Sequence, residues 1–185
     1  MIVLIYPNNL KKEYVKNVSY AKRGMDLEAF INEANKYYDV NNIALIYKKP
    51  TPVTITKVTY EQNNVLTKGK LKCKSSLDYV GVYKGKYLDF DAKSTTNKTS
   101  FPLGNICDHQ INHIKKVLKN SGISFLIIEI NHEIYLFKGE DLINFIENNN
   151  RKSIPYEYIK SYGSEVKLKY NPTLNYLKAL DKLYF

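Results

Sequence analysis

The sequence predicts an α/β domain in which helices flank a mixed central sheet. Apolar residues recur at helical spacing over residues 23–38, which predicts an amphipathic helix. Continuous apolar runs of strand length occupy residues 43–47 and 123–130. Between them, the stretch 75–93 holds two apolar-rich runs that only residues 84–85 separate, a spacing typical of a tight β-hairpin.

The chain before the first helix differs in character from the rest. Residues 1–22 show little periodicity, and their lysines outnumber the one acid, Glu13, so we expect a mobile basic arm. The folded domain is then expected at residues 23–185. Arg23 lies at the predicted start of the helix. Its guanidinium would either contact a phosphate or be an ordinary helix-end residue without a binding role.

A lysine-rich stretch interrupts the domain after the first strand. From Lys48 to Lys74 the chain holds seven lysines and one acid, with only scattered apolar residues. Because such a stretch buries little surface by itself, we expect an insertion at about residues 50–74 that projects from the domain as a hairpin. A disordered surface loop is the alternative.

Counting outward from a loop at residues 84–85 fixes the register of the central hairpin. Asp78 then faces Asp91, and one further pair sets Ser76 opposite Lys93, all on one face of the strands. Opposed carboxylates repel unless one is protonated or a cation lies between them. Carboxylate oxygens favour a hard ion such as Mg²⁺ or Mn²⁺, and the Lys93 ammonium would lie beside it.

An ordinary solvated strand face is the alternative to a metal site at this hairpin. Asp89 shares the face but lies opposite Val80, and for this residue the solvated interpretation is favoured. A helix predicted at about residues 106–120 carries Gln110 on its apolar side. The Gln110 amide could complete a metal site, although spacing alone favours a glutamine that marks a helix boundary.

The remaining elements extend the sheet and cover it. We expect a central strand (123–130), a strand that pairs with it through a two-residue turn (133–137), a short helix (139–148), a further strand (165–170) and a last helix that starts at Pro172 and ends near residue 183.

The charge balance favours an anionic partner, most often nucleic acid. Net charge is +10, from 28 Lys+Arg against 18 Asp+Glu, and the pI is about 9.3. A highly charged solvated surface is the alternative. Lysine supplies almost all of this charge, which suits contact with phosphates more than base recognition. The candidate DNA-binding residues are Arg23, Lys48, Lys49, Lys57, Lys68, Lys70, Lys72 and Lys98.

Cysteine content and hydropathy limit the class of protein. Cys73 and Cys107 are the two cysteines, too few for a disulfide scaffold or a zinc site, which favours the reducing cytoplasm. The apolar run 2–6 is too short for a signal-peptide core, and no run approaches the about 20 apolar residues of a membrane span. The histidines His109, His113 and His132 lack metal-ligand spacing and are expected at the surface or near DNA.

Longer motifs carry a resemblance to known nucleases. Asp78, a gap of twelve residues and then Asp91-Ala92-Lys93 resemble the PD-(D/E)xK nuclease pattern. From about residue 20 onward, the chain resembles the RecU family of bacterial Holliday junction resolvases. The blocks that carry this resemblance are RGMDLEAFINEANKYY (23–38), IYKKPTPVTITKV (46–58), LDYVGVYKGKYLDFDAKSTTNKTSFPL (77–103) and DHQINHIKKV (108–117).

The resemblance implies a restriction-endonuclease-like fold, a stalk at the insertion and a homodimer. It implies Mg²⁺-dependent paired nicking of four-way DNA junctions in recombination and repair, for which we expect 5′-phosphate ends, Mn²⁺ as a substitute ion, and recombinase and branch-migration proteins as candidate partners. Carried over by motif, the metal ligands are Ser76, Asp78, Asp91 and Gln110. Asp78 and Asp91 are then catalytic, and Lys93 stabilises the transition state.

Three positions depart from the family pattern. Threonine is usual where this chain has Ser76 and Leu77, and glutamate is usual at Asp91. Ser76 keeps a hydroxyl, Leu77 faces the core by the pleat, and Asp91 is one methylene shorter. A duplex-specific restriction-type endonuclease and a non-catalytic junction-binding or strand-annealing protein are the alternative functions.

Overall fold

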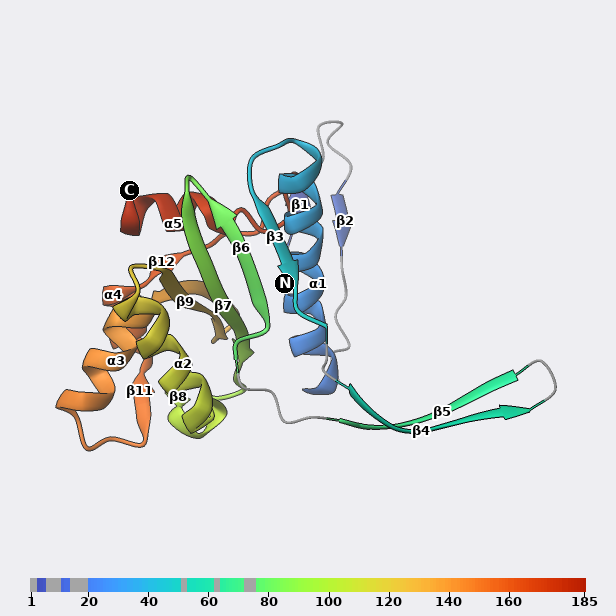
Figure 1. The fold of residues 1–185 in the computed structure, drawn as a ribbon. Helices are drawn as coiled ribbons and strands as arrows, with labels where there is room; N and C mark the ends of the chain where they lie inside the picture. Colours follow the sequence, from blue (N-terminus) through green and yellow to red (C-terminus); the bar gives the residue numbers. More distant parts are fainter. Residues whose placement is uncertain (1–2, 6–10, 14–19, 51–52, 62–63, 72–75) are drawn as a thin grey trace.

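A six-stranded mixed sheet forms the centre of the molecule (Figure 1). The computed structural model describes residues 3–5, 11–13, 20–50, 53–61, 64–71 and 76–185. β7 and β9 run parallel and the other neighbours antiparallel, which confirms the predicted mixed sheet. In spatial order the strands are β12 (Ser164–Glu165), β10 (Glu133–Lys138), β9 (Ile123–Ile130), β7 (Lys86–Ser94), β6 (Tyr79–Tyr83) and β3 (Leu45–Lys48).

Helices cover both faces of this sheet, and each face has its own hydrophobic core. α1 (Tyr20–Val40) and α5 (Tyr176–Tyr184) pack on one face, against Phe90 and Phe125 among others. α2 (Asp108–Lys119), α3 (Gly139–Asn148) and α4 (Tyr156–Tyr162) cover the other, against Leu126 and Ile128. Successive residues of β9 thus enter opposite cores, as expected of a central strand buried on both faces.

The β6–β7 hairpin has the predicted two-residue turn. Lys84 and Gly85 both have positive φ, 47° and 72°, as a type I′ turn requires. Val80 pairs with Asp89 as predicted, but the ladder ends one pair further on, at Tyr79↔Phe90. Asp78 and Ser76 therefore precede β6, and the register count does not extend to them.

The insertion forms a hairpin of its own. β4 (Val53–Glu61) and β5 (Asn64–Leu71) pair antiparallel in a separate two-stranded sheet, with a register shift between Ile55 and Lys57. Figure 1 shows this hairpin extending away from the central sheet, as the lysine-rich composition predicted. We call it the stalk hairpin below.

The ends of the chain differ from the sequence-based expectations. β1 (Val3–Ile5) and β2 (Lys11–Glu13) pair within the expected arm, and α1 begins at Tyr20 rather than at Arg23. The strand expected at 165–170 was wrong beyond Glu165, because the chain there pairs with itself: the Lys169 N–H donates to Thr173 O.

The start of the last helix was also wrong. α5 begins at Tyr176, not at Pro172, because the Asn175 side chain caps it by accepting a hydrogen bond from Lys178 N. The short elements β8 (Ser100–Pro102), η1 (Leu103–Asn105) and β11 (Ser153–Pro155) complete the fold, with β8 paired to β11. Within the described residues, no helix is long and apolar enough to cross a bilayer.

Candidate active site

β7 and α2 bring the predicted catalytic side chains to one face of the sheet. Along β7, Leu88 and Phe90 enter the core beneath α1, so Asp89 and Asp91 point to the opposite face. α2 covers that face, and its buried Gln110 contacts Asp91. The predicted association of Gln110 with the hairpin is present in the structure.

Three donors hold the Asp91 carboxylate. Its Oδ2 accepts a hydrogen bond from Gln110 Nε2 at 2.6 Å and lies 3.0 Å from Lys93 Nζ, while Oδ1 accepts one from Ala92 N at 2.8 Å. The Gln110 Oε1 in turn accepts from Cys107 N at 3.1 Å. In this orientation, Gln110 presents its amide N–H to Asp91, so its predicted role as an oxygen ligand requires the amide to turn.

Burial makes the charge on Asp91 costly. The residue is 2% exposed, and desolvation raises the pKa of its carboxyl above the ordinary value. The Lys93 ammonium opposes this shift, and the negative charge of Asp78 adds to it. A cation placed at these two carboxylates would favour their charged forms and so oppose both causes of the raised pKa.

Asp78 reaches the site from the segment that leads into β6. Its backbone carbonyl accepts a hydrogen bond from Lys49 N at 2.7 Å, which ties it to the residue that follows β3. Its negative charge contributes to the raised pKa of Asp91, although the strand ladder does not pair the two residues. Ser76 lies two residues earlier on the same segment, half-buried, and its hydroxyl donates to Leu77 O at 3.4 Å.

The donor set suits Mg²⁺ better than a softer metal. Within the described part of the chain, no three His, Cys, Asp or Glu side chains are grouped so that they could hold an ion. An ion here would take the carboxylates of Asp78 and Asp91 and complete its shell with neutral oxygens and water. Mg²⁺ is commonly bound in this way, by one or two carboxylates with several waters retained.

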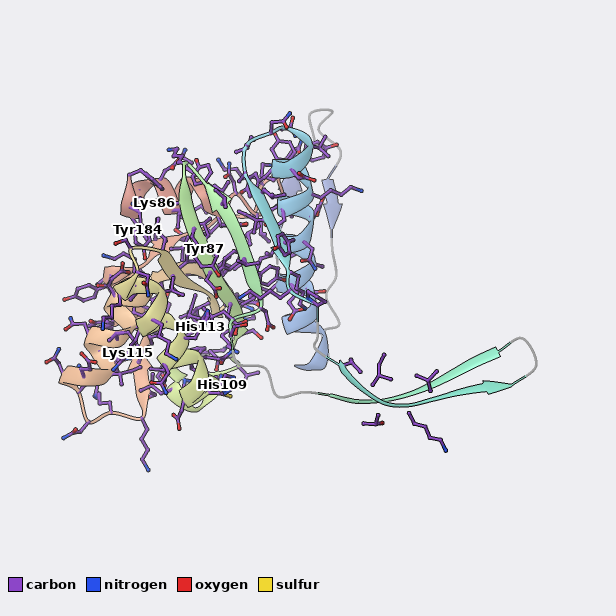
Figure 2. All side chains as sticks on the ribbon, viewed as in Figure 1. Lys86, Tyr87, His109, His113, Lys115 and Tyr184 are labelled. Atoms are coloured by element: carbon purple, nitrogen blue, oxygen red, sulfur yellow. The ribbon has the colours of Figure 1, made fainter. Side chains whose placement is uncertain are left out.

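The burial of a second carboxylate, that of Asp89, was not predicted. This residue has no exposed surface, so the solvated interpretation was wrong. Its Oδ2 accepts hydrogen bonds from Lys49 Nζ and Tyr87 OH, both at 2.7 Å, and lies 3.2 Å from His113 Nε2. His113 projects from α2 and Tyr87 from β7 (Figure 2). Partial desolvation of the hydroxyl, together with its bond to Asp89, raises the pKa of the half-exposed Tyr87, which keeps the hydroxyl a donor.

A weak sequence signal pointed to this network. Gln110 and His113 are three residues apart, so they share a helix face, and Asp91 and Asp89 share a strand face. The two pairs meet across the α2–β7 interface. Lys49 gave no such signal, because it comes from a segment forty residues earlier in the chain.

The predicted DNA-binding residues fall into three groups. Lys48 pairs with Glu28 and Lys49 with Asp89, so both ammonium groups already have carboxylate partners. Lys57 and Lys98 are exposed. The other four lie outside the residues whose side chains are described: Arg23, Lys68, Lys70 and Lys72. Binding of DNA by each of the eight stays a prediction.

Comparisons with known proteins agree with these motifs. The family model described as RecU, Recombination protein U, matches residues 22–182. A Bacillus licheniformis protein named Holliday junction resolvase RecU is 44% identical over 184 residues, which cover 97% of this chain and 93% of that protein. A Bacillus cereus protein of the same name is 44% identical over 195 residues, covering 97% and 98%.

A weaker match is to a solved structure. The structure of Archaeoglobus fulgidus Hjc, described as a Holliday junction resolvase, has a TM-score of 0.45 and 8% sequence identity, and the match covers 76% of this chain and 94% of that one. Family membership follows from the sequence matches. With a family model spanning residues 22–182 and 44% identity along nearly its whole length, this chain belongs to the RecU family.

Proposed function

We propose that this chain is a Holliday junction resolvase, a divalent-metal-dependent endonuclease that nicks opposed strands of four-way DNA junctions during recombination and repair. The observation that carries the proposal is the buried Asp91 carboxylate, paired with Lys93 and influenced by Asp78. It stands on the hairpin where the sequence motif of a nuclease lies, in a chain whose named relatives are Holliday junction resolvases.

Each residue of the site has a distinct role. Asp78 and Asp91 would hold Mg²⁺, or Mn²⁺ in its place, with Ser76 and Gln110 as further oxygen donors. The bound ion would polarise the phosphodiester and lower the pKa of a water. Lys93, two residues after Asp91 on β7, would stabilise the negative charge that develops on the phosphate as the bond breaks. Cleavage would leave 5′-phosphate ends.

Two chains are needed to resolve one junction. Resolution requires cuts in two opposed strands, and one chain carries one Asp78–Asp91–Lys93 site. The simplest arrangement is therefore a homodimer whose two-fold axis matches that of the junction. The net charge of +10 favours binding to the DNA backbone, and the stalk hairpin, with Lys57 exposed on β4, has the shape to enter the open centre of a four-way junction.

A magnesium titration of junction cleavage tests this function. A strand-labelled four-way junction and a linear duplex of the same sequence are incubated with the full chain over a range of Mg²⁺ concentrations, with Ca²⁺ as a non-supporting ion. We expect symmetric nicks in opposed strands of the junction only, with 5′-phosphate ends. Equal cleavage of the duplex would favour a restriction-type endonuclease instead. Junction binding without any nicks would favour a non-catalytic binding protein.

A further inference from the structure

Lys49 joins two segments that carry the predicted metal ligands. Its backbone N–H donates to the carbonyl of Asp78, and its ammonium group donates to Asp89 Oδ2, both at 2.7 Å. Asp89 precedes Asp91 by two residues on β7 and shares its face. A single residue therefore contacts the backbone of one predicted ligand and the strand that presents the other.

The ion pair between Lys49 and Asp89 on β7 is strong because Asp89 is fully buried. A buried carboxylate is costly unless a cation and hydrogen-bond donors compensate it. Lys49 supplies the cation, with its side chain 25% exposed, and Tyr87 supplies a second donor. Asp89 Oδ1 has no hydrogen-bond partner among the described residues. Release of Lys49 would leave the buried Asp89 charge without its cation, with Tyr87 as its hydrogen-bond donor, so the pairing favours the observed position of Lys49.

The same carboxylate lies against α2. His113 Nε2 is 3.2 Å from Asp89 Oδ2, a close polar contact that does not form a hydrogen bond, and one turn earlier Gln110 donates to Asp91 Oδ2 at 2.6 Å. The contact and the hydrogen bond are neighbours along the α2–β7 interface. Asp89 therefore lies between the segment that carries Lys49 and the helix that carries Gln110.

Lys49 also lies at the base of the stalk hairpin. It directly follows the end of β3 at Lys48 and precedes the start of β4 at Val53 by four residues. We propose that Lys49, Asp89 and His113 form a positioning module that sets Asp78 relative to Asp91 and links the base of the stalk to the metal site. The module rests on the proposed function, because its consequence is correct placement of the metal-binding carboxylates.

The affinity of Lys49 variants for a divalent metal ion distinguishes a positioning role of Lys49 from a purely electrostatic effect of its charge. Lys49→Met deletes a positive charge near two carboxylates, so electrostatics alone would tighten the binding of a divalent cation. Loss of positioning would instead weaken it, by about 10-fold or more when an outer-shell partner is removed. We expect the weaker binding, measured by calorimetry with Mn²⁺ on the full chain without DNA. Lys49→Arg keeps the positive charge and its hydrogen-bond donors, and is expected to restore most of the affinity.

Two further variants make the test independent of folding and of general charge loss. Lys49→Met with Asp89→Asn removes both members of the pair, leaves no unpaired buried charge, and is still expected to bind Mn²⁺ about 10-fold more weakly. Lys84→Met is the matched control, because it breaks a 2.6 Å pair with Asp181 at the hairpin turn; its Mn²⁺ affinity should equal that of the wild type.

A metal-independent measurement completes the experiment. Hydrogen exchange at the amide of residue 49, which donates to Asp78 O, should be at least about 10-fold faster in Lys49→Met and in the double variant. Unchanged exchange together with wild-type or tighter Mn²⁺ binding in both variants would overturn the positioning module while leaving the proposed nuclease intact. Absence of any divalent-ion binding by the wild type would overturn the proposed function and the module with it.

Discussion

Two carboxylates on one face of β7 are equally buried and differently compensated. Asp89 and Asp91 are 0% and 2% exposed. Asp89 has the Lys49 ammonium and the Tyr87 hydroxyl as donors at 2.7 Å. Asp91 has Lys93 at 3.0 Å and the Gln110 amide, yet burial and then the negative charge of Asp78 raise the pKa of its carboxyl.

The difference distinguishes a carboxylate that is paired within the fold from one that the proposed metal ion would bind. The donors of Asp89 are Lys49, from the segment that follows β3, and Tyr87, from β7 itself, so its charge connects that segment to the strand. Asp91 keeps a raised pKa because burial and a neighbouring negative charge are only partly offset. Perturbed carboxylates of this kind gather at functional sites, where a cofactor or substrate supplies the missing charge.

The largest expected effect is on cleavage. Asp91→Asn and Asp78→Ala should each reduce junction nicking below detection, since each removes a predicted metal ligand, while Asp89→Asn keeps measurable nicking at saturating Mg²⁺. Single-turnover cleavage of a labelled four-way junction measures this, and gel shifts in Ca²⁺ show that binding persists, because phosphate contacts supply most of the affinity. Asp181→Asn, on α5, is the control and should cleave as the wild type does. Near wild-type cleavage by Asp91→Asn would contradict the assignment of Asp91 as a metal ligand.

Lys93→Ala should have the next largest effect. Its ammonium lies 3.0 Å from Asp91 Oδ2, and removal of one donor that stabilises transition-state charge typically costs about 10²–10³ in rate. We expect this loss in the single-turnover rate at saturating Mg²⁺, with junction binding retained. Lys93→Arg, which keeps the charge, should recover part of the rate. An unchanged rate in Lys93→Ala would exclude Lys93 from the chemistry.

The sequence predicted the Asp91 site better than the Asp89 network for a physical reason. Asp91 and Lys93 lie on β7 and Asp78 directly precedes β6, so the two-residue loop predicted their neighbourhood from nearby residues, although the ladder ends at Tyr79 and strand alternation does not extend to Asp78. Apart from Tyr87 on the same strand, the side chains around Asp89 are Lys49 and His113, which are distant from it in the sequence. Contacts of such long sequence separation depend on tertiary packing, which local periodicity does not encode.

The boundaries that were predicted wrongly have a similar origin. Alternating apolar residues after Glu165 suggested a longer strand, yet the segment folds back so that Leu168 bridges to Leu174. Pro172 suggested a helix start, yet Asn175 caps the helix. In both places the chain satisfied its backbone hydrogen bonds through a local loop that the periodicity could not distinguish from a regular element.

In the absence of metal, substitution of the two carboxylates should change the free energy of unfolding in opposite directions. Asp89→Asn removes the anion that compensates Lys49 and accepts from Tyr87. Breaking a buried pair costs about 3–5 kcal/mol, and since Lys49 is 25% exposed, we expect about 2 kcal/mol lower unfolding free energy. Urea unfolding in EDTA measures the change. Lys115→Met, which breaks an exposed pair with Glu147, should change it by less than about 1 kcal/mol. A neutral effect of Asp89→Asn would mean that the network does not stabilise the fold.

Asp91→Asn should act in the opposite direction by a smaller amount. Because the folded state raises the pKa of Asp91, the stability associated with this group is complete below the unfolded-state pKa of about 4 and is lost as pH rises through the folded-state pKa. The asparagine variant does not titrate, so in EDTA it should exceed the wild type by about 1 kcal/mol at neutral pH, and this gap should close toward pH 4. Mg²⁺ should stabilise the wild type and not the variant. A variant that is less stable than the metal-free wild type at neutral pH would show that Asp91, like Asp89, is a structural anion.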